Sequence, residues 1–181
     1  MDVTNQRKQQ FEHLAAEIFE PLQRYLLRRV HHDEVDDVLS ETLLVIWRRL
    51  EDVPRSEPLP WCYGVARRTL ANNRRSATRR LRLVERVSAQ PTMPIDDVGL
   101  SDIEDPDLLA AFDLLSDEDR DLFQLWAWEQ LEPREIALVL ETTSNAVSLR
   151  LKRAKQRLAS ELLRQKTMSA GHNTEKHAQE M

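Results

Sequence analysis

The chain has 181 residues, 41% of them hydrophobic, and a net charge of −5, so it can build a core in one domain or in two small ones. Three glycines nearly exclude a glycine-rich phosphate loop, and a single cysteine excludes both an internal disulfide and a zinc cluster built on cysteines. The polar N-terminus lacks an apolar signal core, and no apolar run reaches membrane-spanning length, so we expect a soluble, cytoplasmic protein without membrane insertion.

Leu, Ala, Arg, Glu and Gln dominate the composition, which predicts an all-α fold. Apolar residues at helical spacing over 11–26 and 35–50 predict the first two helices of an N-terminal helical domain, residues 8–86. Pro21 is expected to kink the first of these helices or to split it, because proline lacks the N–H that a helix interior needs. Asp33 is a candidate cap for the second helix.

Five acidic residues gather at the start of the second predicted helix. No histidine or further ligand stands at matching spacing, so a solvated helix face is favoured over a metal site. If this face has a function, docking of another protein suits it best. The cluster consists of Asp33, Glu34, Asp36, Asp37 and Glu41.

Three prolines within residues 53–60 predict an extended loop, and a third helix is expected to start near Trp61. Residues 61–86 hold eight arginines and one glutamate, a local charge of +7. Aromatic rings mixed with positive charge suit single-stranded nucleic acid, whose bases stack and whose phosphates are neutralised. At helical spacing, however, Trp61 and Val65 share a face that is better explained as core. We therefore expect the arginines to touch phosphate, Trp61 to be mostly buried, and Cys62 to be a small buried hydrophobe.

Residues 87–106 contain three prolines and several acidic residues without sustained periodicity, so they predict an acidic flexible linker between two small helical domains. The second domain, residues 107–164, starts with a short helix. Its second helix begins at Ser116, which together with Asp119 resembles a capping box. Residues 165–181 are polar and aperiodic and are expected to form a disordered tail.

Residues 133–158 form the most informative segment and predict a short helix, a tight turn and a longer basic helix. Pro133 suits a first helical turn, and Ser144 is a candidate N-cap for the longer helix. That helix has one apolar stripe, and its opposite side fits a DNA major groove, where amides and Arg read base edges, Lys and Ser hold phosphates, and Leu can touch a thymine methyl group. This is a helix-turn-helix candidate, and a solvated basic helix in an ordinary bundle is the alternative. The outward residues are Asn145, Ser148, Leu149, Lys152, Arg153 and Gln156.

The charged residues are strongly segregated along the chain. Residues 96–121 hold eleven acidic residues and one arginine, a local charge of −10, whereas residues 147–166 carry +6. Two basic blocks on either side of an acidic one suggest two anion-binding surfaces, and charge balance between packed domains is the alternative. No Ser/His/Asp or Cys/His arrangement is recognisable, so we expect no enzyme activity, no cofactor, no metal and no small-molecule substrate.

In this order, these segments resemble a bacterial RNA polymerase sigma factor of the extracytoplasmic-function (ECF) class of the sigma-70 family, over roughly residues 10–164. DDVLSETLLVIWRRL (36–50) is similar to the polymerase-binding helix of the family, and PWCYGVARRTLANNRR (60–75) is similar to its promoter-melting helix. Residues 114–158 resemble the C-terminal helix-turn-helix domain that binds the minus-thirty-five promoter element. The resemblance implies an all-α protein that binds core RNA polymerase and promoter DNA and directs promoter-specific transcription initiation.

The resemblance also implies roles for individual residues. The segment that packs on the polymerase is matched by Asp36, Asp37, Leu39, Glu41 and Trp47. The loop at 53–60 matches the loop that captures a flipped base of the minus-ten element, and the acidic linker matches a connector that runs through the polymerase cleft. The implied DNA-binding residues are Arg67, Arg74 and Arg75 near the melted strand or its phosphates, and Asn145, Ser148, Lys152 and Arg153 on the recognition helix.

Departures from the family pattern bear on promoter sequence rather than on the general role. Arg68 stands where the family usually has Asn and could add a phosphate contact, and Asn145 could read an adenine. Members of the class are often held by an anti-sigma factor, although no dedicated site for one is recognisable in this sequence. Two alternatives remain: a helix-turn-helix transcriptional regulator that binds DNA independently of polymerase, and a helical adaptor with no role on DNA.

Overall fold

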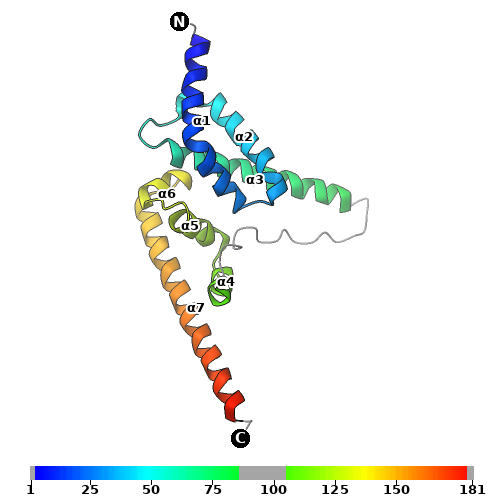
Figure 1. The fold of residues 1–181 in the computed structure, drawn as a ribbon, viewed down its shortest axis with the longest axis vertical. Helices are drawn as coiled ribbons and strands as arrows, with labels where there is room; N and C mark the ends of the chain where they lie inside the picture. The colour runs from blue at the N-terminus through cyan, green and yellow to red at the C-terminus, as the bar shows by residue number, and fades with distance from the viewer. Residues whose placement is uncertain (1–2, 86–104, 179–181) are drawn as a thin grey trace. The chain divides into compact units, whose positions relative to one another are not determined.

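The computed structural model describes the backbone of residues 3–85 and 105–178, and the side chains of residues 4–79 and 105–164. Every regular element in this part of the chain is helical, which confirms the predicted all-α fold. Most of the chain before the predicted linker forms one compact unit and most of the chain after it forms another, and the linker itself lies almost wholly outside the described residues (Figure 1). No helix in the described ranges combines the length and the apolarity that spanning a lipid bilayer requires.

The first unit consists of three helices, α1 (Val3–Leu27), α2 (Val35–Arg48) and α3 (Pro58–Glu85) (Figure 1). Two single 3-10 turns, His32–Glu34 and Leu50–Asp52, lie in the connections. Because these connections are short, successive helices remain neighbours, and each of the three packs on the other two.

The core of the first unit is apolar and receives residues from all three helices. The rings of Tyr25 and Tyr63 lie 5.0 Å apart between centroids and join α1 to α3. The buried hydroxyl of Thr42 donates to the carbonyl of Val38 at 2.7 Å, so this polar group enters the core paired. The buried members include Ile18, Leu22 and Leu26 of α1, Val38, Leu39 and Ile46 of α2, and Cys62, Val65 and Leu70 of α3.

Three expectations about helix boundaries differ from the structure. Helix α1 continues through Pro21, so the proline does not split it, because buried residues on both sides of the proline hold the helix against the core. Asp33 does not cap α2: it lies inside a 3-10 turn, and Glu34 takes the cap position without a side-chain hydrogen bond. Helix α3 begins at Pro58 rather than near Trp61, since the first helical turn has N–H groups to spare and tolerates proline.

The start of α1 is tied to the end of α2 by Arg7. Its Nη2 donates to the carbonyl oxygens of Trp47 at 3.0 Å and Arg48 at 3.4 Å, and its guanidinium lies 5.1 Å from the centroid of the Trp47 ring. Phe11 meets the same ring edge-on at 5.2 Å. A cation at the C-terminal end of a helix complements the helix dipole, so Arg7 both caps α2 and holds Trp47 in one orientation.

The second unit consists of four helices, α4 (Pro106–Asp113), α5 (Asp117–Ala127), α6 (Pro133–Val139) and α7 (Ser144–Ala178) (Figure 1). Asp105 caps α4, since its side chain accepts the second and third backbone N–H groups of the helix while a proline occupies the first position.

Helices α4 and α5 both pack against α7. Phe112 is the centre of this packing, with the rings of Phe123 and Trp128 meeting it edge-on at 5.5 and 5.7 Å. The buried cluster around it contains Ala111, Leu115 and Leu158. The long helix α7 therefore takes part in the core of the unit along its N-terminal half.

The C-terminal part of α7 differs from the expected tail. Residues 165–181 are predicted to be disordered, whereas the structure continues the helix to Ala178. The stretch just after residue 164 contains Gln, Lys, Met and Ala, which have high helix propensity, and extending an existing helix avoids the cost of nucleating a new one. A helix can therefore run beyond its apolar stripe.

Candidate nucleic-acid interface

Helices α6 and α7 are joined by a tight turn closed by the backbone. Pro133 takes the first position of α6, as predicted, and the amide of Ile136 donates to the carbonyl of Glu132 at 2.9 Å. Helix α6 ends at Val139, and two residues later Glu141 has a φ of 54°, in the left-handed region. The amide of Thr142 donates back to the carbonyl of Ala137 at 3.0 Å. This pattern usually has glycine at the left-handed position, so Glu141 holds a turn that its side chain does not favour.

The cap of α7 is one residue earlier than predicted. The Thr143 hydroxyl oxygen accepts the amide N–H of Ala146 at 3.2 Å, and the carbonyl of Thr143 accepts from Val147 at 3.0 Å. Thr143 is therefore the N-cap, and the expectation that Ser144 fills this position is wrong. Both residues have a suitable hydroxyl, and the length of the preceding turn decides between them.

The two faces of α7 are sorted as the periodicity predicts. Val147, Leu151, Ala154 and Leu158 are all buried. The predicted outward residues are all exposed, and Leu149 is the apolar one among them, with 50% of its surface accessible. The outward residues are Asn145, Ser148, Leu149, Lys152, Arg153 and Gln156.

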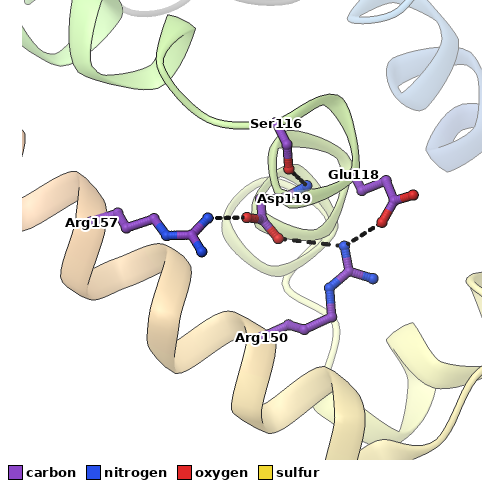
Figure 2. A network of polar contacts seen from close by, with 5 residues as sticks. All are labelled: Ser116, Glu118, Asp119, Arg150 and Arg157. Carbon is purple, nitrogen blue, oxygen red and sulfur yellow. Dashed lines mark hydrogen bonds and ion pairs between the residues drawn. The ribbon is translucent and has the colours of Figure 1, made fainter.

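One carboxylate on α5 holds two arginines of α7. Figure 2 shows Asp119 between Arg157, whose Nη1 donates to it at 2.8 Å, and Arg150, whose Nη2 lies 3.4 Å from its second oxygen. Arg150 also pairs with Glu118 at 3.0 Å. The amide of Asp119 donates to the Ser116 hydroxyl at 3.2 Å, so one half of the predicted capping box is present, while the carboxylate turns to α7.

The remaining basic residues of this part of α7 divide into held and free groups. Lys155 places its Nζ 3.3 Å from the centroid of the Trp126 ring on α5, a cation–π contact. Lys152 and Arg153 are exposed, and neither has an ion pair or a hydrogen bond within the residues that the structure describes. Lys152 and Arg153, both predicted to bind DNA, thus carry the positive charge of the recognition helix that stays available to phosphate.

The four predicted arginines of α3 are not equivalent. Arg74 donates through Nη2 to the carbonyl of Arg29 at 3.1 Å and so holds the end of α1, and Arg67 is half-buried. Arg68 and Arg75 are exposed, with Arg68 also donating to a backbone carbonyl of its own helix.

Two neighbouring predictions on α3 have different outcomes. Trp61 is only half-buried, with the guanidinium of Arg49 5.3 Å from its ring, so the expectation that it is mostly core is only partly met. Cys62 is fully buried as predicted, and this burial raises the pKa of its thiol to about 12. The thiolate is therefore scarce at neutral pH, which argues against a redox sensor.

On α2, the predicted docking residues Asp36, Asp37 and Glu41 are exposed, and Trp47 is half-buried. Leu39 is 3% exposed and belongs to the core, so it supports this surface from beneath. Sequence reasoning missed Leu44, which is 46% exposed.

A signal for Leu44 was present in the sequence. It does not fall on the apolar stripe of α2, and it stands three residues after Glu41 and seven after Asp37, on the same side of the helix. An exposed leucine therefore lies within the acidic face. Across the described residues, no group of three His, Cys, Asp or Glu side chains is placed to hold a metal ion.

Comparison with known protein families identifies both units. The model of Sigma-70 region 2 matches residues 8–80, and that of Sigma-70, region 4 matches residues 106–158. The chain belongs to the sigma-70 family. The resemblance stated from the sequence is confirmed, and the chain is a sigma factor that directs transcription initiation.

Solved structures show the same fold. The sigma factor RpoE, in complex with the anti-sigma factor NepR from Bartonella quintana, is 20% identical with a TM-score of 0.61, covering 85% of this chain and 96% of RpoE. CnrH, in complex with the cytosolic domain of CnrY, is 22% identical with a TM-score of 0.56, covering 84% of this chain and 86% of CnrH. No curated protein matches the chain in sequence.

The cap assignment predicts a difference between two adjacent hydroxyl residues. Thr143→Ala removes the acceptor for the Ala146 amide and should destabilise the start of α7 by about 1 kcal/mol, whereas Ser144→Ala should change little. Amide hydrogen exchange in the first turn of α7 measures the effect of each substitution. Equal effects of the two substitutions, or a larger one for Ser144, would contradict the assignment.

Proposed function

We propose that the sigma factor divides its task between its two units. The N-terminal unit docks on core RNA polymerase through α2 and opens the minus-ten region with α3, and the C-terminal unit anchors the minus-thirty-five element with α7. The observation that carries the proposal is the outward face of α7, which is wholly exposed and has two basic side chains left for DNA. The mechanism needs binding alone, without catalysis.

On α7, the proposed roles follow from side-chain chemistry. Lys152 and Arg153 supply positive charge for phosphates, and an arginine can also read guanine through two parallel hydrogen bonds. Asn145 lies at the N-terminal end of the helix, the end that enters the major groove in helix-turn-helix proteins, and its amide can pair with adenine. Ser148 lies on the same face and offers a hydroxyl to a phosphate.

On α3, the exposed Arg68 and Arg75 are the proposed phosphate contacts of the melted strand. Arg67 is half-buried, and the exposed Arg74 positions the end of α1 through one donor while its other donors stay available. We propose that residues 53–60, which form a loop followed by the first turn of α3, capture a base extruded from the duplex. Such capture can offset an unpairing cost of a few kcal/mol.

On α2, the acidic face with Leu44 at its centre is the proposed surface for core polymerase. Asp36, Asp37 and Glu41 supply charge that selects a basic partner surface, while the exposed leucine supplies apolar area to bury. Trp47, fixed by Arg7 and Phe11, borders this face.

A regulatory partner is also proposed. RpoE, which has a similar fold, was solved in complex with the anti-sigma factor NepR, and this supports an anti-sigma factor as a partner of this chain as well. The long acidic stretch before α5 would repel free DNA, so we propose that tight promoter binding requires polymerase.

Reconstituted transcription tests the proposed function. The full chain is mixed with core RNA polymerase and a genomic DNA pool, and the start sites are sequenced. We expect initiation from a defined set of sites sharing upstream and minus-ten elements, and none without the chain. Tight binding of the chain alone to a symmetric duplex, with no initiation in the presence of polymerase, would instead support an independent transcriptional regulator.

The docking surface makes a second prediction. Leu44→Asp should weaken association with core polymerase at least about tenfold, because burial of one leucine is worth about 1.5–3 kcal/mol. Leu27→Asp, on α1 and 41% exposed, is the matched control and should leave association unchanged. Affinity measured by fluorescence anisotropy of the labelled chain decides, and equal weakening by both substitutions would refute the surface.

A further inference from the structure

One buried side chain of α5 holds two arginines of α7. Asp119 is 9% exposed and accepts hydrogen bonds from Arg150 and Arg157 with its two carboxylate oxygens (Figure 2). The two arginines stand seven residues apart, which is two helical turns, or about 10 Å along the helix axis. A single carboxylate therefore fixes α7 at two points along its length.

Two fixed points restrict both the sliding and the rotation of a helix. Arg150 and Arg157 lie on the flank of α7, between its buried stripe and its reading face, and any rotation of the helix about its axis carries Asn145, Ser148 and Arg153 away from the bases that they would contact. Successive residues of a helix point in directions that differ by about 100°. A rotation of the helix by a fraction of that angle is therefore enough to turn a side chain away from its base. The position of the reading face is thus set by contacts that α7 makes with α5 beside that face.

We propose that Asp119 is a positioning residue for promoter recognition. It sets the angular position of the α7 reading face and thereby the discrimination between promoter sequences, without contacting DNA. This inference rests on the proposed role of α7 in reading the minus-thirty-five element.

Asp119 supports base discrimination but weakens non-specific binding to DNA. Its negative charge partly neutralises Arg150 and Arg157, which lowers the attraction of the unit for any phosphate backbone. Loss of that charge should raise affinity for unrelated DNA while base discrimination falls. A merely structural role would act differently, because partial unfolding lowers binding to all sequences alike and leaves the ratio of affinities unchanged.

Glu118 provides a matched control in the same network. It contacts Arg150 at 3.0 Å, as Asp119 does at 3.4 Å, but its side chain is 78% exposed and has no contact with Arg157 in the described residues. Glu118→Gln removes the same charge as Asp119→Asn and leaves the two-point attachment in place. Comparison of the two variants separates charge from position.

The experiment uses the full chain assembled with core polymerase and a promoter selected by the wild-type protein. Affinity is measured for this promoter and for a version with a scrambled minus-thirty-five element, and the ratio of the two affinities is the readout. We expect Asp119→Asn to lower the ratio at least fivefold, with affinity for the scrambled promoter equal or higher. Glu118→Gln should keep the ratio within twofold of wild type.

A second variant keeps the test decisive if Asp119→Asn fails to fold. Arg157 is 62% exposed in its side chain, so Arg157→Gln removes one of the two attachment points with little loss of packing, and it should lower the ratio at least twofold. A wild-type ratio in each folded variant would overturn the positioning role. Failure of the wild-type chain to select any promoter would instead overturn the proposed function on which this inference rests.

Discussion

The ion pairs between α5 and α7 are the interaction on which the C-terminal unit depends. Helical periodicity fixes which of the seven basic residues within 147–166 share a face, but it does not fix which of them pair within the protein. The acidic first turn of α5 makes that choice, because Asp119 and Glu118 hold Arg150 and Arg157 while the Trp126 ring holds Lys155. The surface left for DNA is small, defined and positive.

The same division explains the net charge of the chain. A net charge of −5 alone argues against a nucleic-acid partner. However, acidic residues of α5 form ion pairs with arginines of the recognition helix within the same unit. On α3, Arg74 and Arg75 are both exposed, and Arg74 is likewise directed to a backbone carbonyl. The net charge of this protein therefore indicates its binding partner only after the internally paired charges have been separated from the exposed ones.

Much of this arrangement could be predicted from the sequence, because helical periodicity fixes which side chains share a face. The buried stripe and the exposed face of α7 agree with that rule residue by residue. Choices that depend on tertiary contacts could not be predicted. Thr143 and Ser144 are chemically equivalent caps, and Leu39 became a candidate docking residue through family resemblance although the core of the unit encloses it. Two of the three prolines that indicated a loop, Pro58 and Pro60, lie in the first turn of α3, where the backbone tolerates them.

The division of α7 into held and free charges is tested most directly by the salt dependence of promoter binding. The logarithm of the holoenzyme–promoter affinity is plotted against the logarithm of salt concentration for the wild type, Arg153→Gln and Arg157→Gln. Because each neutralised phosphate contributes about 0.9 to the slope, Arg153→Gln should reduce the slope by about one, while Arg157→Gln should leave it unchanged. An equal reduction by both substitutions would show that the arginine held by Asp119 contacts DNA after all, and would contradict the account.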